Sequence, residues 1–259
     1  MSESVFIPKH PLLQQVVEYF WTLEGTPSSD DDATLIYPES CFEIILSFDA
    51  ATRWVSGDHE TLLPRSFITP IRTSYYDIHP QGHVEYLAIR FRPAIMPFIS
   101  MPADMFENRA IALDDVLENK FRHMIEPVFS MDNMPERISF LEETLTQWLI
   151  KGVPARPPAF QHAVSMLHHS FGQSPIQMVC EESGLYPRKL ERQFNQYMGV
   201  SPKTYARILR FNFAIQQLLT VPITNSTEMA FQAGYSDQAH FIRECREFTG
   251  RTPGELRSM

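Results

Sequence analysis

The pattern of apolar and polar residues changes character along the chain, and each part predicts a different kind of structure. Between about residues 35 and 100, short segments rich in β-branched and aromatic residues are separated by proline and glycine. This pattern predicts a small antiparallel barrel or sandwich. The predicted strands are Leu35–Tyr37, Phe42–Phe48, Ser66–Thr69 and Val84–Phe91.

From about Leu113 the apolar residues recur at helical spacing instead. They predict one helix that ends near Phe129 and a second helix along Ile138–Trp148. An apolar stripe of only three turns favours packing within the chain over a seam between two copies of it. Three prolines within Val153–Pro158 then bar a continuous helix, and they predict a linker.

Beyond this linker nearly every segment has helical spacing. The predicted helices cover residues 160–171, 176–182, 187–198 and 202–219. The predicted fold class is therefore α+β. A β-barrel followed by two helices occupies residues 1–152, a linker occupies residues 153–159, and an all-α domain occupies residues 160–259.

One pattern occurs twice within the all-α part. Five positions recur 51 residues later with the same or a similar residue: Leu190, Arg192, Gly199, Ser201 and Pro202 return as Phe241, Arg243, Gly250, Thr252 and Pro253. Each copy follows a short apolar helix and a glycine turn, at Gly184 and at Gly234. This order of elements is typical of a helix-turn-helix DNA-binding unit. The long helix predicted from residue 202 to 219 would hold the two units apart.

The charge distribution agrees with a DNA-binding half. The net charge is −9, but residues 1–159 carry 12 Lys+Arg against 23 Asp+Glu, whereas residues 160–259 carry 10 against 8. Such asymmetry is expected when one half of a chain meets phosphate and the other does not. Three scattered cysteines are too few for a disulfide framework or a zinc site. No apolar run approaches the length of a membrane span, so we expect a cytoplasmic protein without a membrane partner.

The second helix of each unit carries the residues expected to contact DNA. The candidates in the first unit are Arg188, Lys189, Arg192, Gln193 and Gln196, and those in the second are Gln238, Ala239, His240, Ile242, Arg243 and Arg246. Arginine can bind guanine, glutamine can bind adenine, and an apolar side chain can meet the methyl group of thymine. Phosphate contacts are expected from Lys203, Arg207, Arg210 and Arg246. Glu191 and Glu244 either contact cytosine or stay away from the DNA.

Two segments resemble a known family. The second copy, Gly234–Arg257, resembles the C-terminal signature of AraC-type (AraC/XylS) transcriptional regulators, and the first copy, Leu190–Tyr205, resembles the matching first unit. The resemblance covers about residues 160–257. It implies that each subunit inserts two helices into successive major grooves on one DNA face, about 34 Å apart. Cys245 and Leu256 stand where the family usually has aromatic residues, which predicts looser packing of the second unit.

The N-terminal half resembles the cupin-like sensor half of one AraC-type branch, through Tyr37–Leu46 and Ala88–Phe98. In that branch the barrel is thought to bind an effector or to mediate association, and the resemblance implies a cupin-like barrel here. Several aromatic residues are candidates for lining an effector pocket, although any small barrel core contains such residues. They are Trp21, Tyr37, Tyr75, Tyr76 and Phe91.

No pattern in the chain favours catalysis. His79, His83 and Glu85 share strand parity, but they lack the tight His-x-His spacing of a metal-binding cupin. They are better explained as surface or pocket-rim residues, so no metal and no cofactor are predicted. The sequence shows no nucleophile elbow, phosphate loop or family-like Cys–His pair, so no catalytic residues and no enzymatic activity are predicted.

The preferred hypothesis is a sequence-specific transcription regulator that responds to an effector. Its expected partners are double-stranded DNA, a small-molecule effector, RNA polymerase and a second copy of the chain in a homodimer. Two alternatives stay open. One is a metal-dependent cupin-type enzyme with a DNA-binding tail, which stoichiometric metal lost on His79→Ala would support. The other is an adaptor whose N-terminal domain only dimerises, which tight dimerisation without a ligand response would support.

Overall fold

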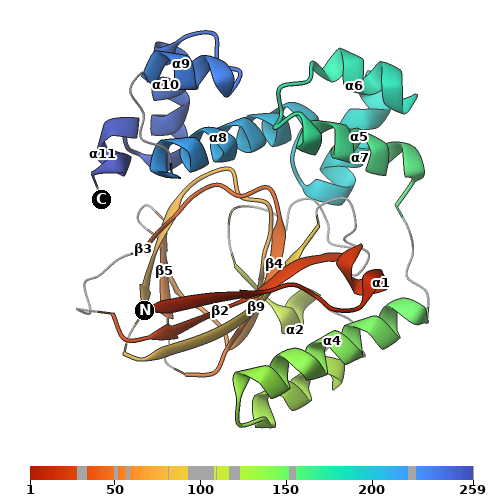
Figure 1. The fold of residues 1–259 in the computed structure, drawn as a ribbon, viewed down its shortest axis with the longest axis vertical. Coiled ribbons are helices and arrows are strands. Elements are labelled where there is room, and N and C mark those ends of the chain that lie inside the picture. The colour runs from red at the N-terminus through yellow and green to blue at the C-terminus, as the bar shows by residue number, and fades with distance from the viewer. Residues whose placement is uncertain are drawn as a thin grey trace. The chain divides into compact units, whose positions relative to one another are not determined.

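The chain forms two compact units. A computed structural model describes residues 1–27, 34–49, 52–56, 59–80, 82–92, 108, 110–116, 123–151, 156–220 and 226–258. The first unit comprises Met1–Leu35, Cys41–Pro70 and Tyr76–Arg156, and the second comprises Ile36–Ser40, Ile71–Tyr75 and Pro157–Met259. Strands dominate the first unit and helices the second, which confirms the predicted α+β class (Figure 1).

The described strands belong to two antiparallel sheets. One has the order β1-β2-β9-β4-β7-β10, and the other has the order β3-β8-β5-β6. These sheets are not joined into one closed barrel, but the arrangement is consistent with the predicted cupin-like fold. The strands are β1 (Ser2–Phe6), β2 (Val17–Gly25), β3 (Thr34–Ile36), β4 (Phe42–Ser47), β5 (Thr52–Ser56), β6 (His59–Leu62), β7 (Ser66–Thr69), β8 (Tyr76–Pro80), β9 (Val84–Phe91) and β10 (Ile111–Ala112).

All four predicted strands are present, as β3, β4, β7 and β9. The two that are richest in apolar residues, β4 and β9, lie next to each other in the middle of the larger sheet. Their register pairs Ile44 with Ile89 and Leu46 with Leu87, and these four side chains are fully buried. Strands that are buried on both faces lose the strict alternation of apolar and polar residues, as these two do.

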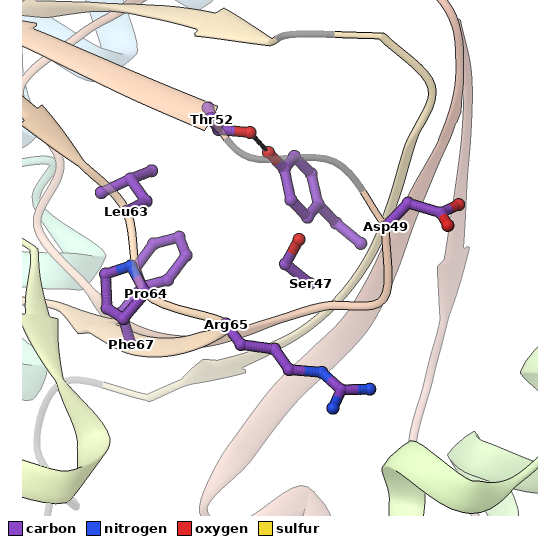
Figure 2. A pocket seen from close by; sticks show the side chains of 8 residues that line it. Ser47, Asp49, Thr52, Leu63, Pro64, Arg65 and Phe67 are labelled. Atoms are coloured by element: carbon purple, nitrogen blue, oxygen red, sulfur yellow. Dashed lines mark hydrogen bonds between the residues drawn. The ribbon is translucent and has the colours of Figure 1, made fainter.

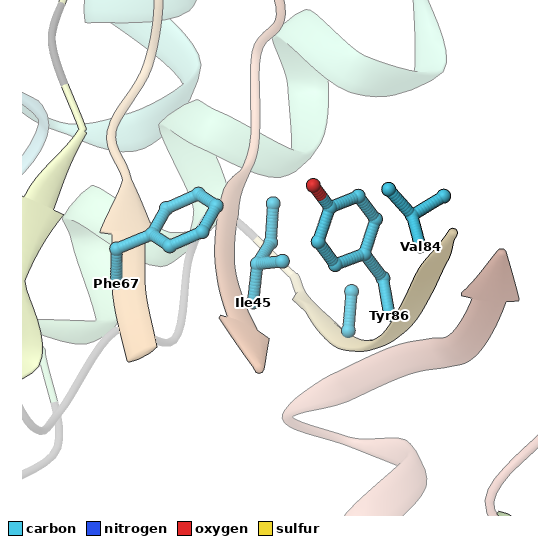
Figure 3. Packing of buried hydrophobic residues seen from close by; sticks show 5 residues of the cluster. Ile45, Phe67, Val84 and Tyr86 are labelled. Carbon is cyan, nitrogen blue, oxygen red and sulfur yellow. The ribbon is translucent and has the colours of Figure 1, made fainter. Parts of the chain in front are cut away.

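A cluster of buried apolar side chains forms part of the core of the first unit (Figure 3). Val84, Tyr86 and Ala88 are alternate residues of β9, so they lie on the same face of that strand. Ile45 of β4 and Phe67 of β7 pack beside them. Trp21 of β2 is partly buried against the same cluster. Side chains from four adjacent strands therefore share this part of the core.

The helices of the first unit differ in part from the prediction. They are α1 (Pro11–Gln14), α2 (Leu113–Val116), the 3₁₀ helix η2 (Glu126–Ser130) and α4 (Met134–Ile150). The helix predicted from about Leu113 to Phe129 differs from the structure at its end, because residues 123–125 are α-helical but Glu126–Ser130 form a 3₁₀ helix. Pro127 lies at the start of that helix, where its missing N–H and its ring prevent an α-helix from continuing through it. Residues 117–122 lie outside the described residues.

Helix α4 covers the second predicted helix and packs within the unit, with Ile138, Leu141 and Leu145 buried. Arg137 attaches it to the sheet. Its guanidinium donates to the Met131 carbonyl (3.2 and 3.0 Å), forms an ion pair with Glu85 of β9, and lies 3.7 Å from the centre of the Phe48 ring. Arg137 is only 7% exposed, so its charge depends on these partners.

The described part of the second unit is mostly helical. Its helices are α5 (Pro158–His169), α6 (Ile176–Ser183), α7 (Pro187–Met198), α8 (Pro202–Thr220), α9 (Ser226–Gln232), α10 (Gln238–Thr249) and α11 (Pro253–Arg257). The predicted helices over 160–171, 176–182, 187–198 and 202–219 all exist with nearly these bounds. Figure 1 shows α8 running from α5–α7 at one end to α9–α11 at the other. Among the described residues, no helix has the length and apolar character needed to cross a membrane.

Replacing Arg137 tests how α4 is held. We predict that Arg137→Ala lowers the free energy of unfolding by about 3 kcal/mol, because it leaves the Glu85 carboxylate without its partner. Urea unfolding of the full chain measures this change. Lys151→Ala, at the exposed end of the same helix, is the control and should stay within about 0.5 kcal/mol of the parent chain. Equal stabilities of the two variants would contradict the assignment.

Candidate nucleic-acid interface

The first helix-turn-helix consists of α6, a tight turn and α7. Gly184 ends α6 with a left-handed backbone (φ +68°), a conformation that glycine adopts without steric cost. The N–H of Leu185 donates to the Cys180 carbonyl (3.0 Å), which closes the helix end. Pro187 then opens α7, where its missing N–H costs no helical hydrogen bond.

The second helix-turn-helix, α9 and α10, repeats this construction. Gly234 also has a left-handed backbone (φ +81°), and the N–H of Tyr235 donates to the Ala230 carbonyl (2.9 Å). The turn is one residue longer than in the first unit. Asp237 caps α10 by accepting the N–H of His240 (2.7 Å), and this bond lowers the pKa of Asp237. The helices α6 and α9 therefore end in the same way, at a left-handed glycine.

The repeated Gly-x-[Ser/Thr]-Pro ends each recognition helix and starts the next helix. Gly199 ends α7 and Gly250 ends α10, both with left-handed backbones (φ +71° and +70°). The Ser201 hydroxyl then accepts the N–H of Thr204 (3.0 Å) at the start of α8. Thr252 and Glu255 form a capping box at the start of α11. The repeat in the sequence is a repeat in the structure.

Most of the side chains predicted to contact DNA are exposed. The buried faces of the two helices hold the predicted apolar residues, such as Phe194 and Phe241. The opposite faces carry polar and cationic side chains, as DNA contact requires. The exposed residues are Arg188, Lys189, Arg192 and Gln196 on α7, and Gln238, Ala239, Arg243 and Arg246 on α10, while His240 and Ile242 are half-buried.

Gln193 and Glu244 differ from this pattern. They occupy equivalent positions, 51 residues apart, and they are only 5% and 3% exposed. Gln193 lies three residues after Leu190, and Glu244 lies three residues after Phe241. Because Leu190 and Phe241 are core residues, this spacing places Gln193 and Glu244 on the inner face of each helix. We therefore leave Gln193 out of the proposed DNA-contacting surface. The alternative in which Glu244 contacts cytosine does not fit a side chain this deeply buried.

Two of the four predicted phosphate ligands are engaged inside the domain. Arg207 of α8 forms ion pairs with Glu244 and Glu247, both at 2.7 Å. Arg210 is half-buried and lies 6.0 Å from the centre of the Tyr235 ring. Lys203, at the start of α8, and Arg246 of α10 are exposed. These two cations are the better candidates for phosphate contacts.

The two departures from the family signature lie in a closed core. Cys245 and Leu256 are 0% and 2% exposed. Phe248 packs edge-on against Phe211 of α8, with 5.1 Å between the ring centres. Burial raises the pKa of the Cys245 thiol to about 11, so this residue behaves as a neutral core side chain. Both positions are closed to solvent, and the predicted looser packing stays a prediction.

The five aromatic residues considered for an effector pocket are divided between the two units. Trp21, Tyr76 and Phe91 belong to the first unit, whereas Tyr37 and Tyr75 belong to segments of the second. Phe91 is fully buried, and the indole N–H of Trp21 donates to the Glu43 carboxylate (3.0 Å). Tyr37 lies edge-on to Phe211, with ring centres 6.4 Å apart. Their role in an effector pocket stays a prediction.

A different set of residues lines a cavity in the first unit (Figure 2). Its volume is about 240 Å³, and the lining residues are Ser47, Asp49, Thr52, Leu63, Pro64, Arg65, Phe67 and Tyr86. Leu63, Pro64 and Phe67 form an apolar wall, and three buried hydroxyl groups face the same space.

The charged residues of this cavity lie at its rim. Asp49 and Arg65 are exposed, whereas Ser47, Thr52 and Tyr86 are buried. The Thr52 and Tyr86 hydroxyls are hydrogen-bonded to each other, and burial raises the pKa of Tyr86, so its hydroxyl stays neutral. The interior of the cavity is therefore uncharged and able to exchange hydrogen bonds with a ligand.

Two of the three residues weighed as metal ligands have other partners. The Nδ1 atom of His83 lies 2.8 Å from the Asp49 carboxylate, and Glu85 is paired with Arg137. Within the described ranges, no group of three or more His, Cys, Asp and Glu side chains has the arrangement of a metal site.

Two segments of the chain match known protein families. Residues 179–259 match the family described as a helix-turn-helix domain. Residues 5–112 match a family described as a domain of unknown function (DUF6597). The two matches fall on the helical unit and on the strand-rich part of the chain, respectively.

Named relatives share part of the chain. The HTH-type transcriptional activator RhaS of Escherichia fergusonii is 28% identical over 110 residues, which are 42% of this chain and 39% of that protein. The uncharacterized HTH-type transcriptional regulator YtdP of Bacillus subtilis is 22% identical over 174 residues, which are 65% of this chain and 22% of that protein. The chain thus matches less than two fifths of either relative.

Solved structures of ToxT from Vibrio cholerae have the same overall fold. One, at 1.65 Å resolution, has a TM-score of 0.52 and 11% identity, and the match covers 92% of this chain and 98% of ToxT. Another, of ToxT from strain O395, has a TM-score of 0.50 and 10% identity over 92% of this chain and 97% of that one. The likeness concerns the fold alone.

The glycine turns offer a direct test of the helix-turn-helix geometry. We predict that Gly184→Ala lowers the free energy of unfolding by about 1–2 kcal/mol, because its backbone is left-handed. A Cβ at Gly184 would meet open space, so the change reports the backbone conformation alone. Gly254→Ala, also in open space but without a positive φ, is the matched control and should not destabilise the protein. Thermal unfolding of the full chain distinguishes the two, and an equal loss in both variants would contradict this turn.

Proposed function

We propose that this chain, whose C-terminal part is a helix-turn-helix domain of the AraC type, is a sequence-specific transcription regulator. It binds promoter DNA by placing α7 and α10 in successive major grooves. One observation carries the proposal: two recognition helices follow the same glycine turn and are joined through a single helix, α8.

The length of α8 supports this mode of binding. At about 1.5 Å per residue, its 19 residues span roughly 28 Å. Successive major grooves on one face of DNA repeat about every 34 Å. A helix of this length, which joins the two helix-turn-helix units, is of the right size to serve two adjacent grooves.

The two recognition helices present different chemistry. The residue equivalent to Arg188 is Ala239, and the residue equivalent to Gln196 is Glu247, while Arg192 and Arg243 correspond. Because base recognition depends on the donor and acceptor groups of these side chains, each helix should favour its own sequence. The DNA site of one subunit is therefore expected to consist of two unlike halves.

Alanine substitutions test the proposed base contacts. We expect Arg192→Ala and Arg243→Ala each to weaken specific binding by about 5- to 150-fold, which corresponds to about 1–3 kcal/mol for a lost bidentate contact. Each should relax the base preference in its own half of the site. Gel shifts at physiological salt, on a duplex enriched from genomic fragments by the protein, measure both effects.

Lys9→Ala is the control for these variants, because it removes one exposed positive charge from the first unit. It should leave specific binding unchanged. Specific binding that survives in the Arg192→Ala, Arg243→Ala double variant would remove these residues from the DNA-contacting surface.

We further propose that the first unit binds an effector in the cavity of Figure 2. The cavity combines an apolar wall with neutral hydroxyl groups, and its charged residues are at the rim. This lining suits a small uncharged ligand with one apolar face and one or two hydrogen-bonding groups. Effector and DNA would then influence each other through the preferred arrangement of the chain, and such coupling acts in both directions.

A double substitution tests the cavity without unfolding it. Thr52→Val with Tyr86→Phe removes both partners of one buried hydrogen bond and keeps their shapes, which is expected to be nearly neutral for stability. We predict that an uncharged metabolite which raises the Tm of the parent chain binds the variant at least about tenfold more weakly. A panel screened by thermal shift provides the measurement. An identical ligand-induced shift in both proteins would exclude this cavity.

The other hypotheses have less support. For the cupin-type enzyme, His83 and Glu85 already have partners, Asp49 and Arg137. For the adaptor, a parent chain that dimerises tightly and shows no thermal shift across the panel would be the favourable result. Homodimerisation and contact with RNA polymerase stay predictions.

A further inference from the structure

The second recognition helix is attached to α8 by charged side chains. Arg207 donates from Nε to Oε1 of Glu244 and from Nη2 to Oε2 of Glu247, both at 2.7 Å. Its guanidinium also lies 5.0 Å from the centre of the Phe248 ring. Glu244 and Glu247 are three residues apart, so they lie on one face of α10. One planar guanidinium therefore holds two points along that face.

Burial makes the inner ion pair important. Glu244 is 3% exposed, and three quarters of the Arg207 side chain is covered. A carboxylate removed from water in this way depends on its partner, so the pair resists separation. Glu244 also lies near Tyr235, the residue after Gly234 in the turn. Burial raises the pKa of Tyr235, and the Glu244 carboxylate raises it further. The Glu244 carboxylate thus joins α10 to α8.

The first recognition helix is attached by a different kind of contact. Gln193, the equivalent of Glu244, carries no charge. Phe194 of α7 packs against Phe160 of α5 and Tyr205 of α8, with ring centres 5.2 and 5.6 Å apart. Apolar packing has little directional preference, whereas a forked ion pair is satisfied only over a narrow range of orientations. The contacts between α10 and α8 therefore restrict the orientation of α10 more narrowly than the contacts of α7 restrict the orientation of α7.

We propose that Arg207 is a positioning residue for DNA recognition, which sets the rotation of α10 on α8 and so the direction of Arg243 and Gln238. The inference rests on the proposed function. Arg243 is the immediate neighbour of Glu244 and is exposed on the other side of the helix. A small rotation of α10 that follows loss of the fork displaces both side chains from their base edges.

Positioning differs from a phosphate contact in what it changes. A phosphate ligand strengthens binding to all sequences, and its removal lowers the salt dependence of binding. Lysine can replace arginine in such a role, since a phosphate accepts a point charge. A positioning residue instead affects discrimination in one half of the site. Lysine cannot replace it, because an ammonium group lacks the planar fork that reaches both glutamates.

The experiment uses the full-length protein and its enriched duplex, with either the first or the second half of the site scrambled. Two variants are compared with the parent: Arg207→Lys, and the double variant Arg207→Met/Glu244→Gln, which leaves no buried charge unpaired and so is expected to fold. Lys203→Met on the same helix is the matched control. Kd is measured for each duplex at several salt concentrations, together with Tm.

We expect discrimination against the scrambled second half to fall about tenfold or more in both Arg207 variants, as for the loss of a bidentate base contact. Discrimination against the scrambled first half and the salt slope should stay as in the parent. Lys203→Met should lower the salt slope by about 1 and leave discrimination intact.

Three outcomes would overturn the inference. Unchanged discrimination in both Arg207 variants removes the positioning role. A lowered salt slope with uniform weakening makes Arg207 a phosphate ligand. Equal losses in both halves, accompanied by a lower Tm, make it a general stabilising residue. Failure of the parent chain to bind any sequence specifically is a different result, and it contradicts the proposed function itself.

Discussion

The whole helical unit, residues 157–259, depends on α8 being one continuous helix. The 19 residues of α8 form one helix, and both helix-turn-helix units pack on it. Near its start, Tyr205 contacts Phe194 of the first recognition helix. Two and six residues later, Arg207 and Phe211 contact Glu244 and Phe248 of the second. Because a hydrogen-bonded helix changes little in length, the spacing of these contact residues along α8 is fixed when α8 forms. Folding of this unit and the proposed placement of its recognition helices on DNA therefore depend on the same element.

The two recognition helices are attached to α8 by partly different chemistry. Aromatic rings hold α7, whereas α10 is held by aromatic packing together with a buried carboxylate and a guanidinium. The exposed faces differ as well, since Arg188 and Gln196 correspond to Ala239 and Glu247. The duplicated framework thus supports two surfaces that are not duplicates. A protein built in this way would bind its DNA in one orientation, which suits a regulator that acts on a promoter with a defined direction.

Much of the second unit could be predicted because local signals mark its helices. Helix α7 begins at Pro187 and ends before Gly199, as predicted, since proline opens a helix and a left-handed glycine closes it. Gln193 was harder, because its polarity suggested the surface although its spacing from Leu190 and Phe194 belongs to the inner face. In the first unit, β2 went unrecognised, because Val17–Gly25 mixes charged and apolar residues without strict alternation. The cavity joins residues from several strands, and no local pattern announces contacts between residues so far apart in sequence.

We propose that one subunit places two recognition helices in successive major grooves. Hydroxyl-radical footprinting of the full-length protein on its enriched duplex tests this most directly. The predicted result is two protected segments on one face of the DNA, about one helical turn apart, with different sequences beneath them. A single protected segment on a specifically bound duplex would contradict the account, because α10 would then stay outside the groove.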